Sequence, residues 1–422
     1  MTVGKGEWRS GWSIVLGCSI GMGTCFAVFN TLSSLFLKGM QQDLGWSRGD
    51  ISTGLSLILI GGLSAPLVGM AIDRIGMRKV ALSCIFALGI IYAGLAMMPA
   101  EQMWFYALML LFGIFGMGTS GVAFTRVINS WFAASRGLAL GVMLTGISIA
   151  GMLLPPVLSG VIESYTWRGG FWLMSGVVLL TALPATFFLV HERREWEREH
   201  GQLQGSFSGP DASASPHGDG LDWRAIWRTR QFWLMIICFV ACNIPGTGIL
   251  SQLQPLLIDK GIAAATAAGM LSIYAAAVMF GHVATGYLMD RYKPTVVACL
   301  YTMVPAFGAA ALLSEHLRWE LAVFAVITLG LAQGAEIDLC AYFCARYFGM
   351  RTYSSVFGVM VMTVNLGGAL GVNFFGQIFD RSGTYDLALM ASVMLVPLGA
   401  LCLLGLGPFP TAFKSDRQPN PA

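Results

Sequence analysis

Long apolar stretches alternate with short polar breaks along the whole chain. Each stretch is long enough for a helix of about 20 residues, the length that crosses the hydrocarbon core of a bilayer. Six stretches lie on each side of one long polar interruption. The pattern predicts an all-α membrane protein with twelve transmembrane helices, at residues 11–37, 52–72, 80–98, 104–131, 137–161, 169–190, 231–257, 264–289, 295–313, 319–347, 353–379 and 385–407.

The interruption runs from His191 to Arg230. It begins with the charged run HERREWEREH and continues with a segment rich in Gly, Ser, Pro and Asp, a composition typical of a linker that is partly helical and partly disordered. We therefore expect an N-terminal bundle at 1–190, a cytoplasmic linker at 191–230, a C-terminal bundle at 231–410 and a tail at 411–422.

Composition excludes a soluble enzyme. Of the 422 residues, 56% are hydrophobic and 11% are charged, whereas soluble domains carry about 25% charged residues. The net charge of +3 gives no electrostatic footprint for nucleic acid. The nine cysteines lie in apolar runs without metal-ligand spacing, so we expect no metal, disulfide or cofactor.

The basic residues are unevenly distributed between the two sides of the predicted membrane. If the N-terminus is inside, 18 of the 25 Lys and Arg residues fall in cytoplasmic segments and 6 in outer segments, while Arg126 lies within a span. Because positive residues accumulate on the cytoplasmic side, the chain is predicted to lie in the cell (inner) membrane with both termini cytoplasmic. The first stretch is too long for a cleaved signal peptide.

Two short motifs recur in both halves of the chain. Residues 69–74 (GMAIDR) match residues 286–291 (GYLMDR) at an offset of 217, and Trp131-Phe132 match Tyr347-Phe348 at an offset of 216. A nearly constant offset indicates parallel repeats. Such repeats form pseudo-symmetric bundles that rock about a site at the midplane of the membrane.

The first motif extends to residue 79 as GMAIDRIGMRK and resembles the loop signature of the major facilitator superfamily. The resemblance implies two pseudo-symmetric six-helix bundles and a transporter rather than an enzyme. It also implies a gating loop that steadies one conformation, although the basic residues could instead only enforce topology. The gating residues predicted on this basis are Gly69, Asp73, Arg74, Gly76, Arg78, Lys79, Asp290 and Arg291.

Within the superfamily, the chain resembles monocarboxylate transporters and oxalate/formate-type antiporters at Ser34 to Arg48 and at Thr352 to Gly358. This resemblance implies a small organic anion as the substrate. The chain also departs from the pattern. His282 occupies the place of the usual arginine of the eighth helix, and residues 353–379 contain no lysine or arginine.

Charged and polar side chains within the spans are candidates for function because each is costly in a membrane. Arg126 could bind a carboxylate with its guanidinium, or form a structural ion pair. His282 could bind an anion or relay a proton, or be a satisfied interior histidine. Asn30, Asn243 and Tyr342 are predicted to line the cavity with them.

Glu336 and Asp338 are two positions apart in the tenth span, so their side chains point about 200° away from each other. At an offset of 216, Asp338 and Tyr342 correspond to Val122 and Arg126. If Arg126 faces the central cavity, Asp338 should face it too, with Glu336 turned towards neighbouring helices. Asp338 is then predicted to be a proton site that interacts with Arg126, with Glu336 as the second proton-coupling candidate. Both acids could also be structural.

These observations predict a secondary active transporter, acting as a monomer in the lipid bilayer, that moves a small organic anion, a monocarboxylate, together with or in exchange for protons. Two alternatives are efflux of amphipathic compounds and a membrane sensor that does not transport. The G-x-G-x-x-G match at Gly116 to Gly121 follows no strand and does not indicate dinucleotide binding.

Overall fold

The computed structural model describes residues 2–24, 26–193, 196, 220–314 and 317–410. These residues are almost entirely helical, and the β-structure among them is one isolated bridge between Gly220 and Gly349. The helices of the first half are α1 (Thr2–Gly23), α2 (Phe26–Leu44), α3 (Arg48–Gly62), α4 (Ala65–Ile75), α5 (Met77–Met97), α6 (Gln102–Gly116), the 3₁₀ turn η1 (Met117–Thr119), α7 (Gly121–Trp131), α8 (Arg136–Val177), the π-helical turn η2 (Val178–Ala182) and α9 (Leu183–Leu189).

Three of the predicted spans of the first half are interrupted helices. The first is interrupted between α1 and α2, and the second bends by 44° between α3 and α4. Proline lies in the first turn of α4, where its missing N–H and fixed φ are tolerated. The fourth span is broken by η1, after which Ser120 caps α7 by accepting a hydrogen bond from the Val122 amide.

The fifth and sixth predicted spans are two helices joined by a tight turn within the stretch Arg136–Leu189. The chain reverses at Tyr165 and Thr166, whose backbone is not helical. Arg168 fixes this turn by donating hydrogen bonds to the carbonyl oxygens of Ala96 and Met98. A two-residue turn is therefore sufficient where the sequence pattern predicted seven residues.

The linker contributes the short helix α11 (Trp223–Ile226), and its residues 194–195 and 197–219 lie outside the described part of the chain, as does the tail at 411–422. The helices of the second half are α12 (Arg230–Asp259), α13 (Ala264–Arg291), α14 (Pro294–Leu312), α15 (Trp319–Phe348), α16 (Tyr353–Ser382) and α17 (Asp386–Leu404). Each corresponds to one predicted span.

Within the described residues, nine helical stretches are long and apolar enough to cross a membrane, or ten if α3 and α4 form one span. Dividing the stretch 136–189 at its turn and adding the pair α1 and α2 gives the twelve predicted passes. Large apolar side chains such as Leu180 (78% exposed) and Met394 (72% exposed) lie on the outer surfaces of both halves. Such surfaces are suited to lipid.

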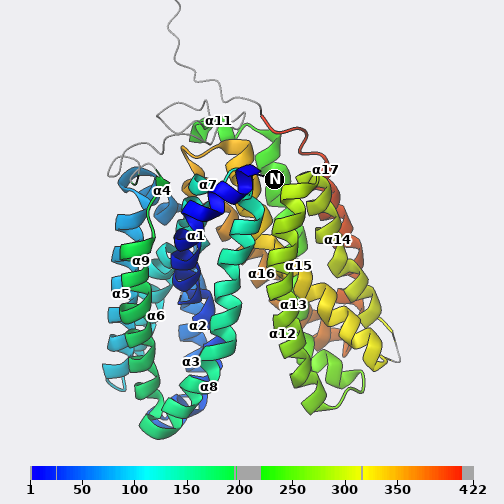
Figure 1. Cartoon of the computed structure of the whole chain (residues 1–422). Helices are drawn as coiled ribbons and strands as arrows, with labels where there is room; N and C mark the ends of the chain where they lie inside the picture. Colours follow the sequence, from blue (N-terminus) through cyan, green and yellow to red (C-terminus); the bar gives the residue numbers. More distant parts are fainter. Residues whose placement is uncertain (1, 25, 194–195, 197–219, 315–316, 411–422) are drawn as a thin grey trace, which may run out of the picture.

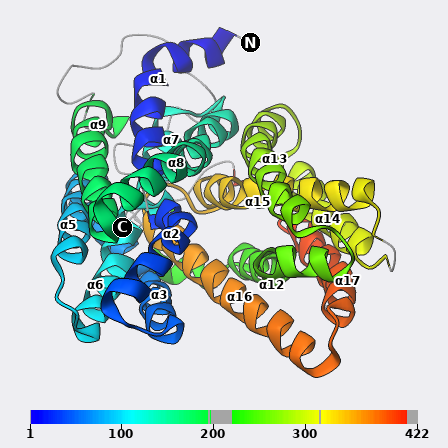
Figure 2. The ribbon, with the colours of Figure 1, turned by 90° about the horizontal axis from the view of Figure 1, so that it is seen from below.

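The passes form two groups, α1 to α9 and α12 to α17, which lie side by side (Figure 2). We call the end of the molecule that carries α11 the linker end, and the opposite end the distal end (Figure 1). The two groups meet at the linker end and diverge towards the distal end. The helices α4 and α8 of the first group pack there against α16 and α13 of the second.

Candidate functional site

Asp73 joins the two halves of the molecule at the linker end. Gly76 has a φ of 101°, a conformation open to glycine, and its turn ends α4 just after Asp73. The carboxylate accepts hydrogen bonds from the backbone amides of Ser354 (3.1 Å) and Ser355 (2.8 Å) and from the Ser355 hydroxyl (2.6 Å). These amides belong to the first turn of α16, where N–H groups lack partners within the helix and favour negative charge.

Asp290 makes the equivalent contact in the opposite direction. It lies at the end of α13 and accepts hydrogen bonds from the amides of Gly137 (2.8 Å) and Leu138 (2.9 Å), in the first turn of α8. The repeated motif therefore places one carboxylate of each half on a helix N-terminus of the other half. We call the α4–α16 and α8–α13 crossings together the gate.

The basic residues of the two motifs do not bridge the halves through any contact that the described residues show. Arg78 donates a hydrogen bond to the Phe187 carbonyl oxygen (2.6 Å) and lies over the Phe187 ring within the first half. Arg74 and Lys79 are exposed, and Arg291 contacts Tyr287 of its own helix. The predicted gating function of these residues stays a prediction.

Glycines bring the gate helices into backbone contact. A Cβ atom at Gly69 of α4 would overlap the carbonyl oxygen of Ser354 on α16. On the other crossing, Gly137 and Gly286 each pack against the carbonyl oxygen of the other. The linker end is closed because side chains are absent at these positions, which allows the helices to approach closely.

Arg126 is part of the same contact region. Its Nη1 atom bonds to Asp73 and lies 3.3 Å from the Ser354 hydroxyl, and its Nε atom bonds to Glu192 at 2.9 Å. The side chain is 14% exposed. Arg126 therefore lies at the gate, with two acids as partners, as in the structural ion pair that the sequence left open. Its role in substrate binding stays a prediction.

Replacing Arg126 by methionine should lower the unfolding temperature of the protein. Removing one partner of a largely buried ion pair costs about 3–5 kcal/mol, and here it leaves both Asp73 and Glu192 without a cation. Thermal unfolding of the purified protein, with and without added lactate, measures the effect. The control is Arg318→Met, since Arg318 is 78% exposed beside Glu320. Unchanged unfolding with loss of a lactate-induced shift would instead favour a binding role.

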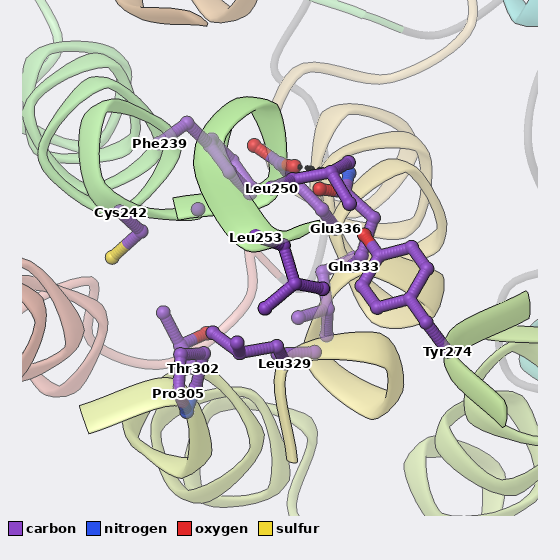
Figure 3. A pocket seen from close by; sticks show the side chains of 13 residues that line it. Phe239, Cys242, Leu250, Leu253, Tyr274, Thr302, Pro305, Leu329, Gln333 and Glu336 are labelled. Atoms are coloured by element: carbon purple, nitrogen blue, oxygen red, sulfur yellow. Dashed lines mark hydrogen bonds between the residues drawn. The ribbon is translucent and has the colours of Figure 1, made fainter. Parts of the chain in front are cut away.

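A small cavity lies within the second half, between α12, α13, α14 and α15 (Figure 3). It encloses about 50 Å³ of free space. The polar side chains at its wall include Glu336, Gln333, Tyr274 and Thr302. The rest of the wall is formed by Phe239, Cys242, Gly246, Leu250, Leu253, Pro305, Leu329, Ala332 and Leu339.

Amide groups hold the Glu336 carboxyl group at the cavity wall. The Asn243 side-chain nitrogen lies 2.8 Å and 3.0 Å from its two oxygens, and the Gln333 side-chain nitrogen donates to Oε2 at 3.0 Å. Thr247 in turn donates to the Asn243 oxygen. Asn243 was predicted as a cavity residue and is the direct partner of Glu336.

Asp338 points away from this cavity. It is fully buried, and its Oδ2 atom lies 3.1 Å from His282 Nδ1 on α13. Its Oδ1 atom is buried without a hydrogen-bond partner among the described residues. Asp338 and His282 are thus neighbours, and within the described residues no contact joins Asp338 to Arg126.

Both acids therefore face helices of their own bundle: Glu336 is turned towards α12, as expected, and lines a cavity inside the second half, whereas Asp338 is buried against α13. The predicted interaction of Asp338 with Arg126 stays a prediction. Packing fixes the rotation of α15. Gly330 and Gly334 lie against the backbone of α13, and Asp338, one further turn along, shares their face.

The remaining predicted residues lie elsewhere. Tyr342 packs beside the Phe343 and Phe409 rings rather than at the cavity wall. Asn30 is on α2, and its side chain is outside the part of the chain that the structure describes.

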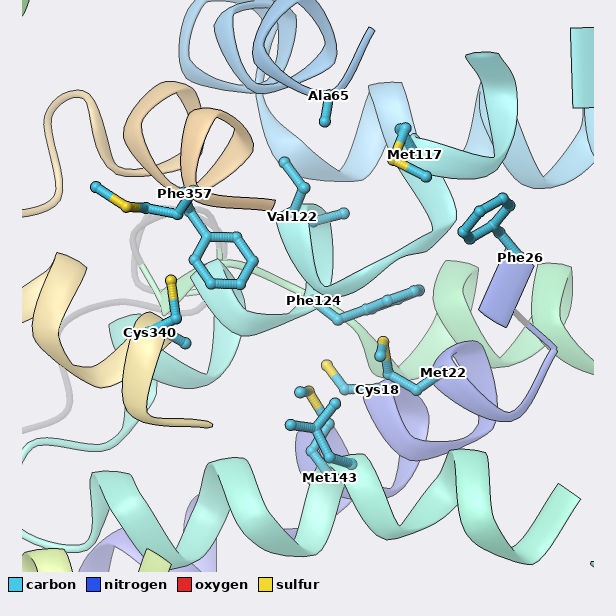
Figure 4. Close-up of a cluster of buried hydrophobic side chains, with 14 of the residues drawn as sticks. Cys18, Met22, Phe26, Ala65, Met117, Val122, Phe124, Met143, Cys340 and Phe357 are labelled. Carbon is cyan, nitrogen blue, oxygen red and sulfur yellow. The ribbon is translucent and has the colours of Figure 1, made fainter. Parts of the chain in front are cut away.

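Apolar side chains fill the space between the halves next to the gate (Figure 4). Phe357 of α16 and Cys340 of α15 join a buried cluster with Val122 and Phe124 of α7 and Met143 of α8. The side chains of this cluster are buried.

The sequence pattern did not identify the residues of the second half that receive Asp73. Ser354 and Ser355 follow directly on the predicted start of a helix, where hydroxyl residues are common. The Tyr353 hydroxyl donates to Thr125 (2.8 Å) and accepts from Asn129 (3.0 Å) of the first half. The hydroxyl residues before the eleventh span were a usable signal for a helix N-terminus, but they do not reveal its partner.

A family model described as "Major Facilitator Superfamily" matches residues 18–372 of this chain. Monocarboxylate transporter 4 of Rattus norvegicus is 25% identical over 431 residues, covering 96% of this chain and 84% of that protein. Agnestins efflux protein AgnL12 of Paecilomyces divaricatus is 22% identical over 409 residues, covering 93% and 84%. The crystal structure of the transporter FucP in the outward conformation superimposes with a TM-score of 0.70 at 16% identity, covering 94% of this chain and 98% of that one. The chain therefore belongs to the Major Facilitator Superfamily and is a transporter, not an enzyme.

Proposed function

We propose that this protein is a secondary active transporter that moves a small organic anion, a monocarboxylate, across the cell membrane by rocking its two bundles. The observation that carries the proposal is the pair of reciprocal contacts at the gate, Asp73 on α16 and Asp290 on α8. In both, the amides at a helix end of one bundle donate hydrogen bonds to a carboxylate of the other. They can break without unfolding either bundle, as alternating access requires.

The conformation described is then the outward-open state. The excess of Lys and Arg in the segments at the linker end supports a cytoplasmic position for that end and for both termini. The gate contacts would close the cytoplasmic side while the distal end admits substrate from outside. The protein, acting as a monomer, would carry the substrate across the bilayer by alternating between this state and an inward-open state.

One observation supports a small carboxylate over a larger amphipathic compound. Relatives that include a monocarboxylate transporter align over nearly the whole chain. The efflux protein among the relatives keeps an amphipathic substrate as the alternative.

The titratable side chains of the second half support coupling of transport to protons. Glu336 at the cavity wall and the Asp338–His282 pair are groups that can take up and release protons within the second half. Coupling could proceed with the proton moving together with the substrate or in exchange for it.

Uptake into proteoliposomes tests this proposal. With an alkaline interior, the purified protein should accumulate labelled acetate or lactate above the level of empty vesicles, and a protonophore should abolish the accumulation. Preloaded vesicles should show counterflow without a pH gradient. Ethidium, an amphipathic cation, serves as the comparison substrate. Movement of ethidium with no flux of any short carboxylate would contradict the proposal.

A further inference from the structure

An open groove lies between α5 and α9 in the first half, in the part of these helices that is nearer the linker end. Its wall is apolar except for one serine. The wall includes Leu82, Ser83 and Phe86 of α5 and Leu183, Phe187 and Phe188 of α9. The groove holds about 480 Å³ of free space, which is within the range of sites that bind small organic ligands.

The groove faces the hydrocarbon of the membrane. The helices α5 and α9 lie side by side at the outer edge of the first group (Figures 1 and 2). Phe86 is 53% exposed and Phe188 is 70% exposed. Ile90, one turn further along α5 than Phe86, is exposed as well. In a chain that spans a bilayer, apolar surface of this kind is covered by lipid, so a lipid chain is the apolar ligand that reaches the groove.

Two basic residues lie at the end of the groove that is nearer the linker end. Arg78 and Lys79 precede Leu82 and Ser83 by four positions on α5, so each pair shares a face of the helix. Arg78 Nη2 donates a hydrogen bond to the Phe187 carbonyl oxygen at 2.6 Å, which holds the guanidinium group against α9. Lys79 is exposed. This end of the groove, which we call its mouth, therefore carries two positive charges.

Arg78 has hydrogen-bond donors left for a ligand. A guanidinium group has five N–H donors, and within the described residues the Phe187 carbonyl oxygen is the one acceptor that Arg78 contacts. Its Nε atom is buried without a hydrogen-bond partner among these residues. Glu192, the acid that follows α9, is paired with Arg126 instead. A phosphate group, with several acceptor oxygens and a negative charge, suits such an arginine.

We propose that the groove between α5 and α9 binds an anionic phospholipid of the membrane leaflet at the linker end. One acyl chain lies in the groove, and the phosphate accepts hydrogen bonds from Arg78 and lies beside Lys79. The site matches the lipid in order along α5, because cations at the membrane surface precede an apolar wall. It lies on the outer surface of one bundle, away from the contact between the halves, so the inference goes beyond the proposed transport function.

Titration of the delipidated protein in detergent with defined lipids, followed by native mass spectrometry, tests the proposal. Dioleoyl phosphatidylglycerol, which is anionic, should bind more tightly than dioleoyl phosphatidylcholine, whose headgroup has no net charge. Each cation near the headgroup should contribute roughly fivefold in affinity, so the double variant Arg78→Gln/Lys79→Gln should bind phosphatidylglycerol about 25-fold more weakly. The double variant should also lose the preference between the two lipids.

A second variant tests the groove without changing its charges. Ser83→Phe places a ring at the wall of the groove and should weaken the binding of both lipids by about tenfold, because the acyl chain loses its apolar contacts. Ile90→Phe is the matched control, since Ile90 is exposed on the same helix but does not line the groove. Arg318→Gln/Arg381→Gln, at exposed positions of the distal end, controls for the change in net charge. Both controls should bind lipid as the parent does.

Three results would overturn the proposal. Equal affinities of the parent protein for the two lipids would exclude recognition of the headgroup charge, and this measurement needs no variant. Unchanged lipid binding by Ser83→Phe would place the lipid elsewhere. Displacement of bound phosphatidylglycerol by inorganic phosphate would indicate an anion site that needs no acyl chain. If loss of the Arg78 contact with α9 prevents folding, Lys79→Gln alone should still weaken phosphatidylglycerol binding about fivefold, and an unchanged affinity would reject the assignment of the headgroup.

Discussion

Alanine at Gly286 is expected to open the linker end of the molecule. A Cβ atom there would overlap the Gly137 carbonyl oxygen, which belongs to the backbone of α8 and cannot rotate away. Overpacking of this kind costs about 1–3 kcal/mol. The cost applies only to the closed gate, so the population of that state should fall by roughly 5- to 150-fold relative to the open one.

Spin labels at positions 74 and 291, both exposed at the linker end, measure the opening of the gate. Double electron–electron resonance should report a longer distance between them. Gly269→Ala is the control. It lies on the same helix, with no atom within 4 Å of the added Cβ, and should leave the distances unchanged. Identical distance distributions for Gly286→Ala and its parent would show that the α8–α13 contact does not hold the gate closed.

Substitution of Asp73 by asparagine should have the second large effect. The carboxylate loses its charge, while two amides and one hydroxyl of α16 lose a charged acceptor. Hydrogen bonds to a charged group contribute about 1.5–3 kcal/mol each. Arg126 also loses one of its two acidic partners. We expect the gate to open at the α4–α16 crossing.

The same label pair reports this opening. Alkylation of cysteine side chains at the linker end, whose rate measures their access to a reagent in water, should become faster. Asp222→Asn serves as the control because Asp222 lies in the linker at the same end, 65% exposed, and pairs with Arg351 of the second half. Asp290→Asn should reproduce the effect at the other crossing. Should both gate variants keep the alkylation rate of the parent, the carboxylates would be structural and the repeated motif would have no gating function.

The twelve passes and the membership in a transporter superfamily were predicted from local patterns. Apolar length and charge bias act within each segment, because a helix in lipid satisfies its own backbone hydrogen bonds whatever its neighbours are. The motif at residues 69–79 likewise predicted a gating function for Asp73, which contacts the first turn of α16. The interruptions of α1–α2, α3–α4 and α6–α7 were missed, since hydropathy does not register a bend.

The sequence by itself thus determined the number of spans, their two halves and the presence of acids within them. Tertiary structure alone decided what these acids face. Ser354 is 281 positions from Asp73, and only the packing of one bundle on the other brings them together. The rotation of α15 on Gly330 and Gly334 turned Glu336 towards the cavity and Asp338 towards His282. A rotation of a helix about its axis depends on close contacts with its neighbours, and those contacts are not encoded in any one segment.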